Sequence, residues 1–290
     1  MKQIGESELI LNSDGSIFHL HLKPNEISDT IILVGDPGRV DTVSDYFDKI
    51  EVKAANREFV THTGTYKGKR ITVTSTGIGT DNCDIVINEL DALVNIDLEK
   101  RVIKEKHTKL NFIRIGTSGA LQPDMPVDSY IITKKAIGFD GLLNFYADRD
   151  KFCDLEFEKA FTEYVGWNKQ LAAPYTVDAS EKLYNKLSEG IREGITIASP
   201  GFYGPQGRII RLQTQDNNLN SKIENFDWHG KKITNYEMES SAIFGLGKML
   251  GHDAVTLCAI IANRMRKEYS KDYKIVVKQL IKLVLDRITV

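Results

Sequence analysis

The chain has 290 residues, of which 41% are hydrophobic, so it can bury a sizeable core in one large domain or two small ones. Its 38 basic and 40 acidic side chains give a formal charge of −2, which argues against nucleic acid or an anionic membrane surface as a partner. The sequence contains no internal repeat and no Pro/Gly/Ser-rich linker, so we expect residues 1–290 to form a single domain.

Short β-branched runs alternate with amphipathic stretches along the chain. The predicted strands are 30–34, 70–75, 110–115, 129–133, 194–199 and 254–262. The predicted helices are 81–96, 180–191, a helix after Glu239, and 270–288. Several strands are apolar throughout, as strands covered on both faces are. The alternation predicts an α/β fold, a three-layer α/β/α sandwich around a central sheet.

The N-terminal residues MKQIGESELILNSDG lack the apolar stretch of a signal peptide, and no run of about 18 apolar residues could cross a bilayer. Three cysteines, Cys83, Cys153 and Cys258, are far apart and lack metal-ligand spacing, which indicates a reducing compartment and no disulfide framework. We therefore expect a cytoplasmic protein.

Glycine-containing segments follow three of the predicted strands: GDPGR (35–39), TGIGTDN (76–82) and GTSGA (116–120). Glycine lets backbone N–H groups approach a ligand closely, and phosphate is the natural occupant of such a crevice. Arg39 and Arg114 would add bidentate donors. Arg114 interrupts an apolar strand, and a buried arginine requires either an anion or an internal acid. Neither the G-x-G-x-x-G fingerprint nor the Walker A loop is present, which disfavours a dinucleotide-binding dehydrogenase and an ATP site.

The segment NYEMESSAIF (235–244) places two carboxylates at the start of an apolar helix. Glu237 and Glu239 would point the same way on a strand but to roughly opposite faces of a helix. A strand-to-helix junction is where α/β proteins usually bind ligands. The alternative is that both are first-turn acids that stabilise the helix dipole.

Six motifs, GDPGR, STGIG, RIGTSGAL, GFYGPQGR, NYEMES and ANR, resemble in order and spacing those of the nucleoside phosphorylase family, which includes uridine phosphorylases and hexameric purine nucleoside phosphorylases. The resemblance extends from FHL at 18–20 nearly to the C-terminus. It implies a phosphorylase/hydrolase-like fold with a mixed central sheet. It also implies a pentosyltransferase that cleaves the N-glycosidic bond of a nucleoside with inorganic phosphate, giving the free base and ribose 1-phosphate.

Motif by motif, the resemblance implies three groups of site residues. The phosphate would be bound by Gly35, Arg39, Arg114 and Thr117, with Arg57 supplied by a neighbouring subunit. The ribose would lie against Glu237, Met238 and Glu239, with a neighbour's His19 at the 5′-hydroxyl. The base would contact Phe202, Gln206, Arg208 and Ile261, supported by Arg264 through Arg208 or a water molecule.

Two positions bear on the choice of base. Gln206 and Arg208 follow an FY pair at the spacing that uridine phosphorylases use for the uracil edge. A carboxamide can pair with a carbonyl and an N–H of uracil, and an arginine can stabilise negative charge on the departing base. Purine enzymes of the family have a proton-donating aspartate where this chain has Asn263. We therefore expect phosphorolysis of uridine. The alternatives are a purine nucleoside phosphorylase, a nucleosidase of the same fold that uses water, and a catalytically silent nucleoside-binding protein.

The resemblance also implies the partners. Inorganic phosphate would be the co-substrate, with no cofactor and no resident metal at the reaction centre, although some relatives bind a monovalent cation at a dimer interface. If Arg57 and His19 reach a neighbouring site, a homodimer is the minimum active unit, and a homohexamer of three dimers is the larger alternative.

Overall fold

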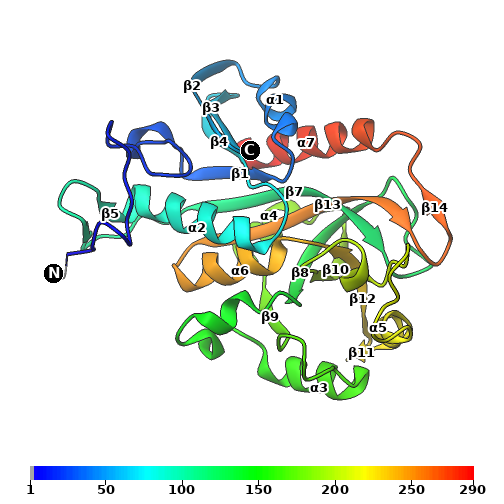
Figure 1. Cartoon of the computed structure of the whole chain (residues 1–290). Coiled ribbons are helices and arrows are strands. Elements are labelled where there is room, and N and C mark those ends of the chain that lie inside the picture. Colours follow the sequence, from blue (N-terminus) through cyan, green and yellow to red (C-terminus); the bar gives the residue numbers. More distant parts are fainter. Residues whose placement is uncertain (1–2) are drawn as a thin grey trace.

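The structure is a computed structural model that describes residues 3–290 (Figure 1). Its centre is a large mixed sheet with strand order β11-β12-β10-β8-β13-β7-β1-β4-β3-β2. These strands are β1 (Thr30–Val34), β2 (Lys49–Asn56), β3 (Phe59–Tyr66), β4 (Lys69–Ser75), β7 (Asn111–Ala120), β8 (Tyr130–Gly138), β10 (Arg192–Ala198), β11 (Asp227–Trp228), β12 (Lys231–Glu237) and β13 (Asp253–Asn263). Two short strands extend the sheet: β9 (Tyr175–Asp178) pairs with β8, and β14 (Glu268–Tyr269) pairs with β13.

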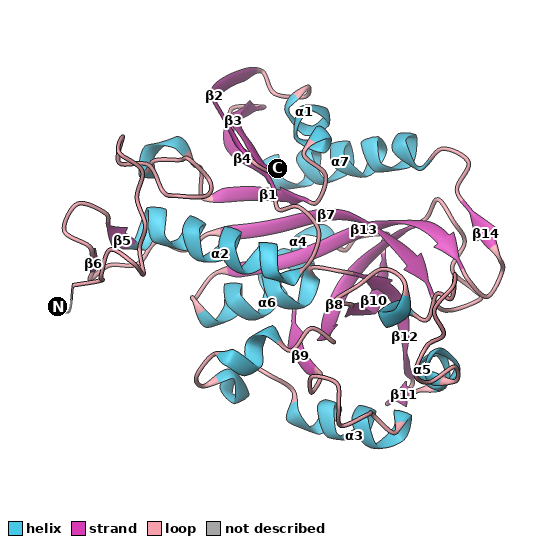
Figure 2. Ribbon diagram, in the orientation of Figure 1, coloured by secondary structure: helices cyan, strands magenta, loops and turns pink. Residues whose placement is uncertain are grey.

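Helices cover both faces of this sheet (Figure 2). The α-helices are α1 (Gly38–Ser44), α2 (Thr80–Asn95), α3 (Leu155–Val165), α4 (Glu181–Leu187), α5 (Leu219–Asn225), α6 (Ser240–Met249) and α7 (Tyr273–Thr289). Helices α2 and α6 pack against one another, with α6 on β7, β8, β10 and β13, whereas α4 and α7 pack together and also contact β13. The predicted three-layer α/β/α fold with a mixed sheet is confirmed.

Part of the sheet closes on itself. Strands β7, β13, β8, β10 and β12 pair in succession, and β12 pairs back antiparallel to β7 through Asn235 opposite Ala120 and Tyr236 opposite Gly119. The result is a closed ring of strands. One end of this ring brings the last residues of β12 beside those of β7, two segments separated by more than a hundred positions in the chain.

Local sequence explains how the chain turns at the ends of its strands. All five residues of β1 are buried, as expected for a strand covered on both faces. Gly79 precedes α2 with a φ of 99°, a conformation that glycine adopts without steric cost. The chain can therefore turn sharply from β4 into α2.

Most predicted elements are present, with three differences. The predicted helix 180–191 ends at Leu187, and β10 begins a few residues later at Arg192. The glycine segment 116–120 is not a turn, because it continues β7 to Ala120 and pairs with β13. The charged segment 95–109 contains a small separate hairpin of β5 (Ile96–Asp97) and β6 (Val102–Ile103). Within residues 3–290, no helix is both long and apolar enough to span a bilayer.

Candidate active site

A pocket of about 730 Å³ lies where β1, β7 and β12 end and α1 and α6 begin. Eleven of the residues predicted for the site line it, although they come from segments far apart in the chain: Gly35, Arg39, Arg114, Thr117, Phe202, Gln206, Arg208, Glu237, Met238, Glu239 and Ile261. The fold therefore brings the predicted phosphate, ribose and base groups together in one cavity.

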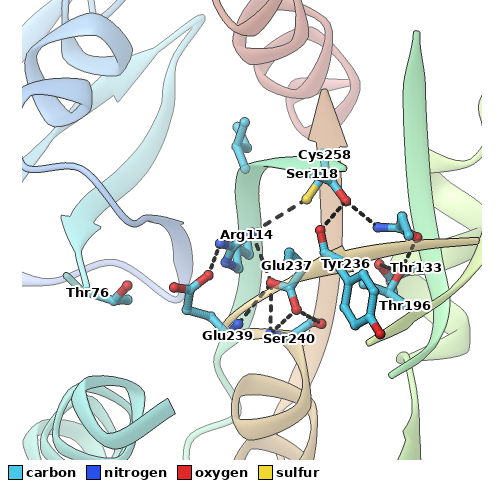
Figure 3. Close-up of polar contacts among 12 residues, drawn as sticks. Thr76, Arg114, Ser118, Thr133, Thr196, Tyr236, Glu237, Glu239, Ser240 and Cys258 are labelled. Carbon is cyan, nitrogen blue, oxygen red and sulfur yellow. Dashed lines mark hydrogen bonds and ion pairs between the residues drawn. The ribbon is translucent and has the colours of Figure 1, made fainter. Parts of the chain in front are cut away.

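Arg114 is a buried charge at the end of the pocket predicted to bind phosphate. Its side chain is 6% exposed, and its guanidinium forms an ion pair with Glu239 and lies 3.4 Å from the Glu237 carboxylate (Figure 3). Of the two partners that the sequence allowed for this arginine, the internal acid is present in the structure. The Nε atom of Arg114 is buried and has no hydrogen-bond partner among residues 3–290, so one donor is left for a further group.

The electrostatics at Arg39 favour an anion. Burial alone would lower the pKa of Arg114, but the charges of Glu239 and Glu237 outweigh burial and raise it. At Arg39, burial and then the positive charge of Arg114 lower the pKa. Arg39 forms no ion pair among the described residues and would gain from an anion in the pocket, whereas the charge of Arg114 is already met by Glu237 and Glu239.

The two carboxylates of the segment NYEMESSAIF have different surroundings. Glu237 is the last residue of β12, and its carboxylate accepts the backbone N–H groups of Glu239 at 3.0 Å and Ser240 at 3.1 Å. It therefore fixes the start of α6, and burial raises its pKa. One oxygen of the Glu239 carboxylate pairs with Arg114, and the other accepts the backbone N–H of Gly79 at 2.8 Å. Neither acid lies in the first turn of α6, where the alternative prediction placed them; Glu237 ends β12, lines the pocket and accepts backbone N–H groups at the start of the helix.

A buried polar chain holds β12 against β7 behind these carboxylates (Figure 3). The Ser118 hydroxyl donates to the Tyr236 carbonyl at 2.7 Å and accepts from the Asn235 amide at 2.6 Å. The side-chain oxygen of Asn235 in turn accepts a hydrogen bond from the Thr196 hydroxyl at 2.9 Å. Sequence reasoning missed Asn235, although an asparagine inside a buried strand signals a polar network.

Gln206 is buried at the opposite end of the pocket and is held by two arginines. Its side-chain oxygen accepts from Nη1 of Arg208 and lies 3.5 Å from Nη2 of Arg264. Nη1 of Arg264 donates to the Gln206 backbone carbonyl. The Arg208 guanidinium stacks 3.7 Å from the centre of the half-exposed Phe202 ring. The predicted support by Arg264 therefore runs through Gln206 and not through Arg208.

Burial, followed by the charge of Arg264, lowers the pKa of Arg208 to about 10. Within residues 3–290, the amide nitrogen of Gln206 makes no hydrogen bond. Because the oxygen of the same carboxamide is already engaged, the nitrogen is the end that is available to a ligand.

Asn263 does not face the pocket. Its amide nitrogen donates to the backbone carbonyls of Gln122 at 2.9 Å and Met125 at 2.6 Å, and its oxygen accepts the N–H of Arg266 at 3.0 Å. The side chain is buried and fastens two loops together. No acid stands at this position to protonate a departing base.

Two predicted residues, His19 and Arg57, do not line the pocket of their own chain. His19 Nδ1 lies 2.6 Å from the Glu89 carboxylate. Arg57 is exposed in the turn between β2 and β3, with a φ of 54°. The pocket rim instead contains Tyr269 and Tyr273, which sequence reasoning missed although they follow the predicted strand 254–262.

The chain matches the Phosphorylase superfamily over residues 29–289. It belongs to this family. A uridine phosphorylase of Thermococcus kodakarensis is 32% identical over 268 residues, covering 89% of this chain and 81% of that protein. A uridine phosphorylase of Escherichia coli K12 is 28% identical over 265 residues, covering 88% and 89% of the two chains. A guanosine phosphorylase of Halorubrum lacusprofundi is also 28% identical, over 245 residues that cover 84% and 83%.

A solved structure agrees with this assignment. The Trypanosoma brucei nucleoside phosphorylase, described as showing uridine phosphorylase activity, superposes with a TM-score of 0.86 at 30% identity, covering 96% of this chain and 98% of that one. Because the family includes relatives named for uridine and for guanosine at similar identity, membership fixes the type of reaction more firmly than the base. The base has to be argued from the pocket.

Cys258 lies 3.6 Å from Arg114, but burial raises its pKa to about 12, which keeps it in the thiol form. Residues 3–290 contain no group of three His, Cys, Asp or Glu side chains arranged to hold a metal ion.

Proposed function

We propose that this phosphorylase-superfamily member is a uridine phosphorylase, which converts uridine and inorganic phosphate reversibly to uracil and ribose 1-phosphate. One observation carries the proposal: a carboxamide fixed by two arginines, Gln206, lies in the same pocket as the buried pair Arg39 and Arg114. The names of the similar proteins from Thermococcus kodakarensis and Escherichia coli support it. The reaction needs phosphate as co-substrate and no further cofactor.

The base end of the pocket suits uracil. With its oxygen engaged by the arginines, Gln206 presents its amide nitrogen as a donor to a uracil carbonyl. Arg208 lies beside it and would stabilise the negative charge that develops on the departing base. Asn263 is tied to backbone groups and cannot act as the acid that a purine ring nitrogen needs.

The other end of the pocket suits a phosphate nucleophile. Departure of the base leaves an oxocarbenium-like ribose, which the carboxylates of Glu237 and Glu239 and the phosphate would stabilise. Arg39 and Arg114 would hold the phosphate in line with the breaking bond, so that the attack is pre-oriented. A nucleosidase that uses water has no need for two buried guanidinium groups, which favours phosphorolysis over hydrolysis.

We place the remaining two residues, His19 and Arg57, in the site of a neighbouring subunit. Their absence from the lining of their own pocket supports this placement, as does the exposure of Arg57 and of the rim residue Ile78, which is 69% exposed. A two-fold dimer would exchange these groups reciprocally between its two sites.

The test is cleavage of uridine, thymidine, inosine and adenosine by the purified protein, with and without inorganic phosphate. Free base and ribose 1-phosphate are both measured. Phosphate-dependent release of uracil is expected. Release of hypoxanthine or adenine in preference to uracil would refute the assignment of the base, and equal release without phosphate would refute phosphorolysis.

A further inference from the structure

A second groove, of about 850 Å³, lies at the edge of the sheet where β10, β12 and β13 begin. It shares no lining residue with the active pocket. Its walls come from β8, β10, the start of α4, the turn between β11 and β12, and the last turn of α6. The groove is therefore a separate feature of the fold, and the proposed reaction does not use it.

The groove has more positive than negative side chains. Its lysines are Lys109, Lys134, Lys135, Lys182, Lys231 and Lys248, and its carboxylates are Asp178, Glu181, Glu193 and Asp253. Several of these charges neutralise one another, as Lys135 does with Asp178 at 2.8 Å and Lys231 with Glu193 at 2.7 Å. Among the described residues, Lys134 and Lys248 form no ion pair within 4.0 Å. The Lys134 ammonium lies 4.3 Å from the centre of the Tyr184 ring, and Lys248 is exposed.

A β-bulge aims two consecutive lysines into the groove. In the pairing of β8 with β10, Thr133 lies opposite Gly194 and Lys135 opposite Ile195, so Lys134 is the extra residue. Consecutive residues of a regular strand point to opposite faces, yet Lys134 and Lys135 both line the groove. Bulges commonly re-aim side chains near functional sites. The bulge thus brings both lysines to the wall, although the Lys135 ammonium is paired with Asp154 and Asp178 and the Lys134 ammonium lies over the Tyr184 ring.

The rest of the lining offers other kinds of contact. Asp253 is nearly buried, and its Oδ2 atom has no hydrogen-bond partner among residues 3–290. The Lys182 ammonium lies 3.7 Å from this carboxylate and donates to the Asn111 side-chain oxygen at 3.3 Å, so an anion would compete with these two contacts for it. Phe244 and Ile195 supply apolar floor, and Trp228 supplies an aromatic edge.

We propose that this groove binds a sugar phosphate. The phosphate dianion would lie near Lys248 and Lys134, with Lys182 turning toward it from Asn111 and Asp253. A sugar hydroxyl is the donor that Asp253 Oδ2 lacks once Lys182 turns to the phosphate. The apolar floor would receive the carbon face of the sugar ring. Inorganic phosphate satisfies only the first of these contacts, so the groove should distinguish a sugar phosphate from the free ion.

The experiment is titration calorimetry of the full chain with ribose 5-phosphate. Because the active pocket also attracts phosphate, two sites per chain are expected for the unmodified protein. The double variant Lys134→Gln/Lys248→Gln should lose one of them, with affinity at the groove reduced about tenfold or more, as expected when charged hydrogen bonds are removed. Arg39→Gln should weaken the other site and leave the groove unchanged.

The matched control is Lys169→Gln/Lys278→Gln, which removes the same charge from exposed positions outside the groove and should retain two sites. Melting temperatures of both double variants verify that they are folded. Two sites retained by Lys134→Gln/Lys248→Gln would overturn the proposal, as would a single site in the unmodified protein that the double substitution leaves unchanged. Equal groove affinity for inorganic phosphate, sulfate and ribose 5-phosphate would also overturn it, because the groove would then be a nonspecific anion site. Uridine turnover is not measured, so the result is independent of the proposed function.

Discussion

The ion pair between Arg114 and Glu239 predicts that phosphate and nucleoside bind with positive coupling. In the proposed reaction, the phosphate uses the guanidinium of this pair and the ribose hydroxyls use its carboxylate. An oxyanion bound at Arg114 competes with Glu239 for that guanidinium, which leaves the carboxylate free to accept hydrogen bonds from the ribose. The informative change is Glu239→Gln, which removes the charge and keeps the shape of the side chain.

The size of the coupling follows from the charges involved. Two unit charges 4 Å apart attract by about 4 kcal/mol at an effective dielectric constant near 20. Only part of this attraction has to be given up, because Arg114 retains Glu237 at 3.4 Å. Coupling free energies between two ligands are typically about 1–3 kcal/mol. We therefore expect saturating sulfate to lower the Kd of uridine by about tenfold, which corresponds to roughly 1.4 kcal/mol.

Sulfate serves as the probe because it resembles phosphate without supporting turnover, so calorimetry can measure uridine affinity at equilibrium. In Glu239→Gln, the ratio of uridine Kd values without and with sulfate should fall to about one. Glu58→Gln is the control, since Glu58 lines the same pocket but forms no ion pair with Arg114. Reciprocity requires uridine to tighten sulfate binding by the same factor. No sulfate effect in the unmodified protein, or a full effect in Glu239→Gln, would refute the reasoning.

Three further outcomes can be measured. Gly116→Ala should raise the KM for phosphate about tenfold or more, because the added Cβ would lie 1.9 Å from Arg114 Nη1. Gly119→Ala in the same strand is the control: a Cβ there meets nothing within 4 Å, so KM should change little. The variants Arg57→Ala and Arg114→Ala should each be inactive. If each subunit of a two-fold dimer supplies Arg57 to its neighbour's pocket, an equal mixture of the two variants should regain about a quarter of normal turnover after subunit exchange. No recovery would place Arg57 outside the neighbour's site. Hydrogen bonds from Lys282, Lys67 and Tyr66 lower the pKa of Asp286. The stability that this carboxylate contributes is therefore present above the ordinary pKa of about 4 and is lost as the pH falls through the folded-state value. Asp286→Asn should lower the melting temperature at pH 7 and reduce the decline of the melting temperature in acid, and an unchanged acid decline would contradict this.

Apolar periodicity predicted several of the elements that face the core, but not β3, β12 or α3, which also bury side chains. The helix predicted at 270–288 is α7, whose stripe of Val277, Leu280 and Val284 is buried. The hairpin of β2 and β3 was not predicted, because β2 is only partly buried and its residues KIEVKAAN carry charge and alanine instead of a continuous apolar run. A strand is recognised in the sequence by its run of buried apolar residues, so a partly exposed strand at the margin of the sheet is harder to predict.

Motifs predicted which residues line the pocket but not how they contact one another. Arg114 was expected to meet an anion or an acid, and only the fold could show that the acid is Glu239, which lies 125 positions away. The sequence could not show that Arg264 supports Gln206, because this contact depends on where the loop after β10 is placed relative to the end of β13. Contacts between distant segments depend on the path of the backbone, and a single sequence without homologues does not encode that path in any local pattern.

The closed ring of strands limits how the pocket can open. Two of the proposed phosphate-binding residues, Arg114 and Thr117, belong to β7 and the proposed ribose-binding residue Glu237 to β12, and these two strands are hydrogen-bonded neighbours in the closed ring. A hinge motion between these two walls of the pocket would have to break the backbone hydrogen bonds that join these strands. Entry and exit of ligands therefore fall to the connecting segments around the mouth, such as the stretch from Arg264 to Asp272, and turnover would be limited by loop motion while the walls stay fixed.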